Sequence, residues 1–255
     1  MSLPDLVLVH GGAHAADCWD LTIAELKRHH PLLRVVALDL PGRGSKPGNL
    51  ATATIAEWVD SVVADIDEAG LDEIVIVGHS MAGVTVPAVV AKLGSARVRE
   101  MVLVTAFVPP QGAAIVHTLD GPFAWFARRA AKKNKPVLPP KALARYAFCN
   151  GMTAQQRAFS LSRLYTESVR IVAERVDRSD LPADVPRTWI LTTRDRALSI
   201  RSQRNSISAL GGVQTEISVP ACHDVMISHP ETLALKLIER CRARTLPTAR
   251  QYGQP

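Results

Sequence analysis

The chain has 255 residues, which suits one α/β domain with room for an inserted subdomain. Hydrophobic residues make up 47% and charged residues 21%, and no apolar run approaches the roughly 18 to 20 residues of a bilayer span, so an integral membrane protein is excluded. The net charge of +6 comes largely from residues 128–141 and 240–250. Neither segment interleaves aromatic and basic residues, so we expect no nucleic-acid partner.

The cysteines and the first residues bear on the compartment. Cys18, Cys149, Cys222 and Cys241 have no C-x-x-C spacing, so we expect free thiols rather than a disulfide framework or a zinc site. No basic region or cleavage site precedes the apolar run at 6–9. We therefore expect a cytoplasmic protein with no membrane partner.

Strand-like and helix-like patterns alternate through most of the chain. Six apolar, β-branched runs predict strands, at 5–9, 35–40, 73–78, 98–105, 188–192 and 214–219. Helical spacing occurs between them, at 19–29, 51–69, 81–93, 199–210 and 230–242. This alternation predicts an α/β fold with a mainly parallel six-stranded sheet and helices on both faces.

The alternation stops between Pro109 and Pro186. Helical candidates there are 122–132, 141–148 and 153–176, and they carry much of the aromatic content: Phe123, Trp125, Phe126, Tyr146, Phe148, Phe159 and Tyr165. We expect residues 109–186 to form a helical cap over a core of 1–108 and 187–246, supplying apolar pocket walls. For any single aromatic residue, packing for helix stability is an equally open alternative. Residues 247–255 are expected to be a disordered tail.

Residues 73–83, EIVIVGHSMAG, predict a strand, a sharp turn at Ser80 and a helix. A serine on such a turn has its hydroxyl exposed above the sheet, which makes Ser80 a candidate nucleophile. The pattern departs from G-x-S-x-G because Ala82 occupies the fifth position and the glycine follows at Gly83. Taken alone, the match is equally compatible with a surface serine at the end of a strand.

Two further residues follow predicted strands and so belong at the same sheet edge as Ser80. Asp195 and His223 complete the order Ser, Asp, His, in which histidine activates the serine and the carboxylate orients the histidine. His229 lies farther from the last strand, and Asp224 is adjacent to His223 and should point away from it. We therefore predict a triad of Ser80, Asp195 and His223.

The sequence His10-Gly11-Gly12 follows the first strand. Glycines there let backbone N–H groups point into the space above the sheet, so Gly12 is the expected first oxyanion donor, with the N–H of Met81 as the second. An ordinary strand-to-helix turn is the alternative reading of the glycines by themselves.

Together these motifs resemble the α/β-hydrolases, in the group of plant methyl esterases, hydroxynitrile lyases and bacterial carboxylesterases. The resemblance rests on three segments and the two remaining triad residues: LVHGGAH with Trp19, DLPGRG at 39–44, GHSMAG at 78–83, and Asp195 with His223. It covers residues 5–240 and is weakest across the cap. It implies the α/β-hydrolase fold with a helical cap insertion.

Two departures from the lyases bear on the reaction. Hydroxynitrile lyases of this group typically carry a threonine in the oxyanion loop and a lysine after the catalytic histidine. Gly11 and Asp224 stand in those places, so hydrolysis is favoured over cyanohydrin cleavage. Cys222 replaces an acidic residue that family members often place before the histidine.

The expected function is that of a serine carboxylesterase that forms an acyl-enzyme on Ser80 and needs no metal or organic cofactor. Its partner would be a small ester with an apolar portion, and a homodimer is compatible with the sequence. The expected pocket residues are His14, Trp19, Phe107, Trp125 and Tyr165. A ligand receptor on the same fold and a hydrolase of lactones or C–C bonds remain alternatives.

One charged segment of the predicted cap bears on the substrate. It contains Arg128, Arg129, Lys132, Lys133 and Lys135. Its positive field could attract an acidic substrate, although a solvated face is the simpler reading.

Overall fold

A computed structural model describes residues 3–119, 121–133 and 135–245. Within them six strands form one sheet in the order β2-β1-β3-β4-β5-β6, and every neighbouring pair is parallel. The strands are β1 (Asp5–Val9), β2 (Val35–Leu38), β3 (Ile74–His79), β4 (Val98–Val104), β5 (Arg187–Thr192) and β6 (Thr215–Val219). The predicted six-stranded α/β fold is therefore confirmed.

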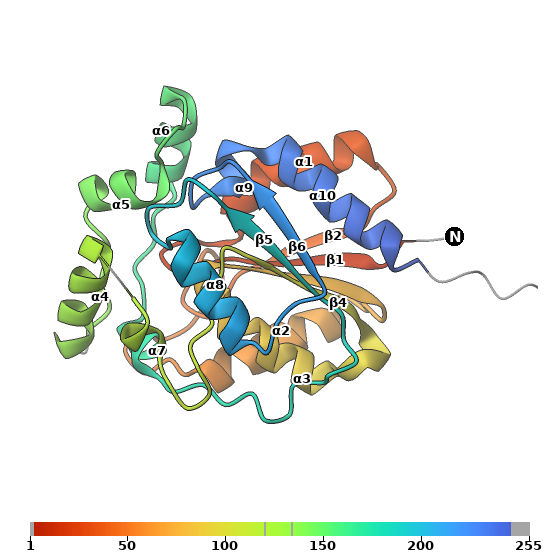
Figure 1. The fold of residues 1–255 in the computed structure, drawn as a ribbon, viewed down its shortest axis with the longest axis horizontal. Helices are drawn as coiled ribbons and strands as arrows, with labels where there is room; N and C mark the ends of the chain where they lie inside the picture. The colour runs from red at the N-terminus through yellow and green to blue at the C-terminus, as the bar shows by residue number, and fades with distance from the viewer. Residues whose placement is uncertain (1–2, 120, 134, 246–255) are drawn as a thin grey trace, which may run out of the picture.

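Helices cover both faces of this sheet (Figure 1). One face carries the short helix η1 (Ala16–Trp19), α1 (Asp20–His29), α9 (Val225–Ser228) and α10 (Pro230–Ala243). The other carries α2 (Ile55–Glu68), α3 (Val86–Arg97) and α8 (Ile200–Ala209). Within the described part of the chain, none of the helices combines the length and apolar character needed to cross a bilayer.

The first strand shows why its sequence is a continuous apolar run. Val7 and Val9 are buried in the core beneath α2 and α3, whereas Leu6 and Leu8 are buried in the core beneath α1 and α10. Successive strand side chains point to opposite faces, and here both faces are covered by helices. Strand β1 is therefore held rigidly just before the glycine loop that follows it.

Helix boundaries differ from the sequence pattern where capping decides them. Helix α2 begins at Ile55 rather than at residue 51, because the hydroxyl of Thr54 accepts the N–H of Glu57. The predicted helix at 81–93 is divided into a short 3₁₀ turn, η2 (Ser80–Gly83), and α3.

The insert, which we define as residues 109–186, contains η3 (Ile115–His117), α4 (Gly121–Lys133), α5 (Lys141–Phe148), α6 (Ala154–Ser162) and α7 (Val169–Ala173). In Figure 1, α4 and α5 lie on the side toward which the arrows of β5 and β6 point. The predicted helix at 153–176 is wrong, because α6 and α7 are separate helices. Between them Glu167 pairs with Val137 in an isolated antiparallel bridge, which requires extended backbone. The predicted tail at 247–255 lies outside the described residues.

Candidate active site

Ser80 is the first residue of η2, at the tight turn that directly follows β3. Its φ of 53° is in the left-handed region, and such a backbone is maintained only by close packing around it. A Cβ at Gly78 would come within 2.9 Å of Val86, and one at Gly83 within 2.4 Å of the Phe107 carbonyl oxygen. The glycine requirement therefore lies at position 83, where the helix meets neighbouring backbone, and Ala82 is accommodated beside it.

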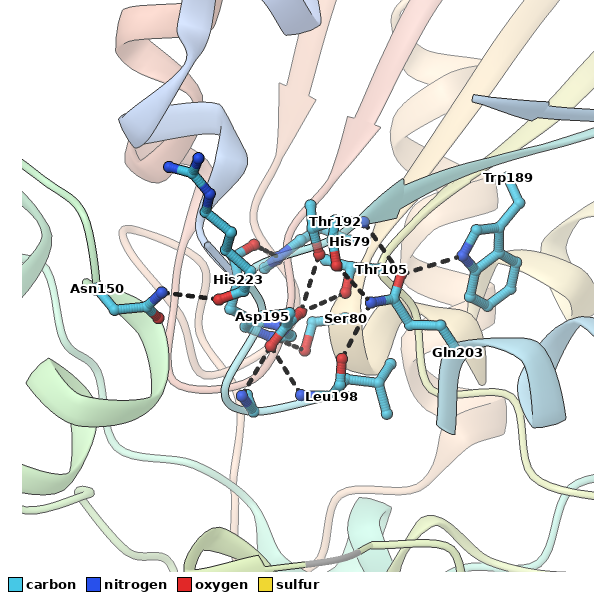
Figure 2. Close-up of polar contacts among 12 residues, drawn as sticks. His79, Ser80, Thr105, Asn150, Trp189, Thr192, Asp195, Leu198, Gln203 and His223 are labelled. Carbon is cyan, nitrogen blue, oxygen red and sulfur yellow. Dashed lines mark hydrogen bonds and ion pairs between the residues drawn. The ribbon is translucent and has the colours of Figure 1, made fainter. Parts of the chain in front are cut away.

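The structure brings the three predicted triad residues together in one line (Figure 2). The Nε2 atom of His223 lies 2.8 Å from Ser80 Oγ, and its Nδ1 atom lies 2.7 Å from Asp195 Oδ2. All but a few per cent of the side-chain surface of His223 and Asp195 is removed from solvent. This geometry allows His223 to receive the serine proton while Asp195 holds its ring.

The Asp195 carboxylate is surrounded by donors besides His223. Two backbone N–H groups bind Oδ1 and two threonine hydroxyls bind Oδ2, from Ala197 and Leu198 at 2.7 Å each, Thr105 at 2.5 Å and Thr192 at 3.1 Å. Burial acts to raise the pKa of Asp195, but the charge and hydrogen bond of His223, with these donors, lower it below its ordinary value. Asp195 is therefore ionised at neutral pH.

The two threonines were not identified from the sequence. Thr105 has a φ of 39°, which is unusual for a β-branched residue, and it directs its hydroxyl at Asp195 from the end of β4. Thr192, at the end of β5, has its N–H bound by the buried side chain of Gln203 (Figure 2). The sequence does contain a signal for both. Each is a threonine at the carboxyl end of a strand, and these two strands are neighbours at the edge where Asp195 lies.

The predicted oxyanion donors border the same space. Gly12, Ser80 and Met81 all line the pocket described below. Within the described residues the N–H of Gly12 has no hydrogen-bond acceptor, and the N–H of Met81 lies in the first turn of η2, where no intrahelical acceptor exists. Both groups are available for a developing oxyanion, and their role remains a prediction.

Gly11 is packed directly against the nucleophile turn. A Cβ at this position would lie 2.7 Å from Ser80 Cβ and 3.0 Å from the His79 carbonyl oxygen. We expect Gly11→Ala to lower kcat at least tenfold and the free energy of unfolding by about 1–3 kcal/mol through overpacking. Ester hydrolysis assays and urea unfolding measure the two effects.

Gly12→Ala is a milder comparison for this change. Its nearest neighbour would be a side-chain atom, Glu167 Oε2, at 3.1 Å, which is a longer contact than the 2.7 Å at position 11, so a smaller loss of stability is expected. Equal activity of wild type and Gly11→Ala would show that the loop yields freely, contrary to this prediction. The same contact leaves no room at position 11 for the threonine side chain of the lyases.

The pocket beside Ser80 is mainly apolar, and most of its wall comes from the insert. Phe107 and His223 contribute from the core. The insert contributes a set of apolar side chains, which includes Ile115, Leu119, Phe126, Ala130, Phe148, Val169 and Val172. Glu167 also lines the pocket.

Of the five predicted pocket residues, Phe107 lines the pocket and the other four lie elsewhere. Trp19 is fully buried in the core beneath α1 and α10, and the hydroxyl of Tyr165 donates to Asp17. Trp125 is 66% exposed, because the pocket face of α4 is formed by Phe126, Ala127 and Ala130. His14 is buried outside the pocket, where its ring contacts Asp224.

The described side chains of the basic segment do not line this pocket. Arg128, Arg129, Lys132 and Lys135 are exposed, so the simpler interpretation of a solvated face fits them. The side chains of Lys133 and of Phe123, one of the predicted cap aromatics, lie outside the described residues.

His14 and Asp224 form a buried pair next to the triad. Nε2 of His14 lies 3.2 Å from Asp224 Oδ2, which also accepts the Ser160 hydroxyl at 3.0 Å. Nδ1 of His14 lies 2.8 Å from the Gly12 carbonyl oxygen. Both ring nitrogens thus face acceptors, which requires the doubly protonated imidazolium.

The pKa values of the pair agree with that charge state. Burial acts to lower the pKa of His14, but the charge and hydrogen bond of Asp224 raise it above its ordinary value. Burial acts to raise the pKa of Asp224, and the charge of His14 lowers it. As expected from the sequence, Asp224 points away from Ser80, while its neighbour His223 points toward it.

His79 directly precedes Ser80, and its ring packs against that of His223, with the ring centroids 4.8 Å apart. Burial lowers its pKa to about 3, so the ring is neutral, and Nε2 donates to the His223 carbonyl oxygen at 3.0 Å. This bond fixes the backbone of His223 relative to β3, the strand that leads to Ser80.

Comparison with known proteins agrees with this architecture. A carbendazim hydrolyzing esterase of Nocardioides sp. is 24% identical over 92% of this chain and 98% of its own length. A putative chloroplastic methylesterase 11 of Arabidopsis thaliana is 25% identical over 92% of this chain, which spans 63% of that protein.

A solved structure shows the same fold. An extracellular alpha/beta-hydrolase from a Paenibacillus species, described as sharing structural and functional homology with Tobacco Salicylic Acid Binding Protein 2, superposes with a TM-score of 0.82. It is 22% identical, and the match covers 93% of this chain and 98% of that one. A family model described as the alpha/beta hydrolase family matches residues 6–236. The chain therefore belongs to the α/β-hydrolase family.

Proposed function

We propose that the protein is a serine carboxylesterase. The observation that supports this most strongly is the continuous contact from Asp195 through His223 to Ser80, at 2.7 and 2.8 Å, opening into an apolar pocket beside the Gly12 N–H. Serine is a weak nucleophile at its own pKa and needs such a base and acid.

The reaction follows from these positions. Ser80 Oγ bonds to the ester carbonyl carbon as its proton passes to His223 Nε2, and the N–H groups of Gly12 and Met81 stabilise the oxyanion. Collapse of the tetrahedral intermediate breaks the bond to the alcohol, which takes the proton from His223. Water then attacks the acyl carbon as its proton passes to His223. The bond from that carbon to Ser80 Oγ breaks, Ser80 takes the proton back from His223, and the carboxylic acid is released.

The substrate is expected to carry an apolar acyl or alcohol portion. The insert side chains that form most of the pocket wall are hydrocarbon or aromatic, and burying such surface drives binding. Hydrolysis is favoured over cyanohydrin cleavage because Asp224 is an anion engaged by His14, and position 11 has no space for a side chain.

Stopped-flow kinetics with p-nitrophenyl esters of increasing acyl length test this proposal. We expect a burst of p-nitrophenol no larger than the enzyme concentration, followed by steady turnover. A fluorophosphonate should label one residue, and peptide mass analysis should locate it at Ser80. Labelling elsewhere, or no turnover with any ester, would contradict the proposal. Tight binding of an apolar ligand without turnover would instead favour a receptor.

We also propose a cytoplasmic location. All four cysteines are buried free thiols in the structure, which suits a reducing compartment.

A further inference from the structure

We propose that Glu167 of the insert is a positioning residue for the oxyanion loop. It would hold the peptide between Gly12 and Ala13, so that the Gly12 N–H points into the pocket. This inference rests on the proposed esterase function and deepens it, because it makes the insert part of the catalytic geometry and more than a pocket wall.

The first support is the contact itself. Glu167 Oε2 accepts the N–H of Ala13 at 2.7 Å, across 154 residues of sequence. The side chain of Glu167 is only 11% exposed, and its Oε2 lies 3.1 Å from where a Cβ on Gly12 would be. The carboxylate therefore packs directly against the residue expected to donate to the oxyanion.

Glu167 is itself held from two sides. Its Oε1 accepts the N–H of Ser168 at 2.6 Å and forms an ion pair with the guanidinium of Arg43. The side chain of Arg43 is fully buried and lies over the ring of Trp58, with the Arg43 Cζ atom 5.7 Å from the ring centroid. A buried carboxylate with a charged partner and backbone donors has little freedom to rotate.

The same peptide is held from its other end. The Gly12 carbonyl oxygen accepts from His14 Nδ1 at 2.8 Å, and His14 is fixed in turn by Asp224. The peptide thus has its C=O bound by a buried cation and its N–H bound by a buried anion. Both partners are themselves fixed in ion pairs, so any other orientation of this peptide is disfavoured.

The loop needs this restraint because its backbone is not relaxed. Ala13 has a φ of 58°, a left-handed conformation that non-glycine residues adopt rarely. Its N–H bond to Glu167 and the bond from the Tyr165 N–H to its carbonyl oxygen, at 2.9 Å, both favour that conformation, and loss of the first weakens the restraint. Since ψ of Gly12 and φ of Ala13 flank the same peptide, a change in that conformation would move Gly12.

The restraint also links two parts of the chain. Glu167 belongs to the insert and is fixed there by its bridge with Val137, through two backbone hydrogen bonds of 2.8 and 2.9 Å. Gly12 and Ala13 belong to the loop after β1. The position of the Gly12 N–H therefore depends on how the bridge between Val137 and Glu167 packs against the core.

Glu167→Gln tests the role with little change in shape. An amide has one acceptor oxygen, so it cannot accept from Ala13 on one side and from Arg43 and Ser168 on the other. Removing one oxyanion donor costs about 10²–10³ in kcat, and misaligning it should cost less, so we expect kcat to fall about 10- to 100-fold. KM should change less than threefold, because the amide still fills the same space. Arg43→Lys, which keeps a cation beside an intact carboxylate, should cause a smaller loss of kcat.

The matched control is Glu174→Gln. Glu174 is also in the insert, and its carboxylate also accepts a backbone N–H of the core, that of Ile55 at 2.9 Å, but far along the chain from the oxyanion loop. We expect this variant to retain the kcat of wild type. Thermal unfolding of all variants identifies any that fail to fold.

Binding of phenylboronic acid supplies a readout that needs no turnover. Its boron bonds to Ser80 Oγ, the serine proton passes to His223, and the anionic adduct places a hydroxyl where the oxyanion forms. In calorimetry, Glu167→Gln should weaken this affinity by the factor seen in kcat, while Ser80→Ala should abolish it.

The possible outcomes separate this inference from the proposed function. Wild-type affinity and kcat in folded Glu167→Gln and Arg43→Lys would overturn it and leave the esterase intact. A raised KM with unchanged kcat would also overturn it, because Glu167 would then be a substrate-binding group. If wild type binds the boronic acid through Ser80 but cleaves no ester, the function fails and the affinity series still decides the role of Glu167.

Discussion

Ser80→Ala is expected to lower kcat for a p-nitrophenyl ester by on the order of 10⁵- to 10⁶-fold, and His223→Ala by about as much. Alanine at 80 removes the atom that bonds to the carbonyl carbon. Alanine at 223 leaves the serine, which His223 contacts at 2.8 Å, without a proton acceptor. The two groups act as a unit, so the double variant should be no less active than either single one.

Initial rates at high enzyme concentration measure these losses, with fluorophosphonate titration to exclude traces of wild type. Ser45→Ala is the matched control: Ser45 is exposed in the loop after β2, and its removal should leave kcat unchanged. Asp195→Asn should cost about 10⁴-fold, because the wrong imidazole tautomer is then favoured. A His223→Ala variant within tenfold of wild type would mean that another base acts on Ser80.

Asp224→Ala is expected to lower the free energy of unfolding by about 3–5 kcal/mol, as the loss of one member of a buried ion pair does. Asp224 is completely buried, and its Oδ2 accepts from both His14 and Ser160. The substitution leaves these donors without their acceptor and creates a cavity. Urea unfolding followed by tryptophan fluorescence gives the difference directly.

Two variants calibrate this effect. Asp60→Ala removes an ion pair with Lys92 in which both side chains are more than half exposed, and it should leave stability almost unchanged. Asp224→Asn should fall between the two, because the amide oxygen still accepts from Ser160 and His14 can lose its proton. A loss for Asp224→Ala as small as that for Asp60→Ala would argue against a charged pair.

The pH dependence of this stability has a definite sign. The pKa of His14 is raised above 6.5, so its contribution is complete below that pH and is lost as the pH rises through the folded-state value. The pKa of Asp224 is lowered below 3.8, so its contribution is complete above that pH and is lost as the pH falls through the folded-state value. The difference between wild type and Asp224→Ala should therefore be largest between these two pH values.

The sheet and the meeting of Ser80, Asp195 and His223 at one edge could be predicted because the signals are local strand patterns and strand ends. A buried strand, a glycine and Ser80 are adjacent in sequence, and strand ends place Asp195 and His223 at the same edge by topology. The orientation of insert helices is not local. The face of α4 that lines the pocket is set by contacts with distant segments, so the sequence does not reveal that Trp125 faces solvent.

The polar partners of the site could not be predicted for a related reason. Thr105, His14 and Glu167 form hydrogen bonds with partners that are distant in the sequence. The separations are 90, 210 and 154 positions, respectively. No spacing in the sequence encodes such contacts, and a buried histidine or glutamate gives no sign of its partner. Asp224 was predicted to point away from Ser80, but its pairing with His14 becomes evident only in three dimensions.

The site is built from two parts of the chain, and this has a consequence for protein engineering. The core contains Ser80, Asp195, His223 and the glycine loop, while the insert supplies most of the apolar pocket wall. Exchanging the insert between relatives is an obvious way to transfer substrate preference. In this chain such a chimera would also exchange the carboxylate that binds Ala13, so a graft that fits the new substrate has to restore that contact with the host loop and with Arg43.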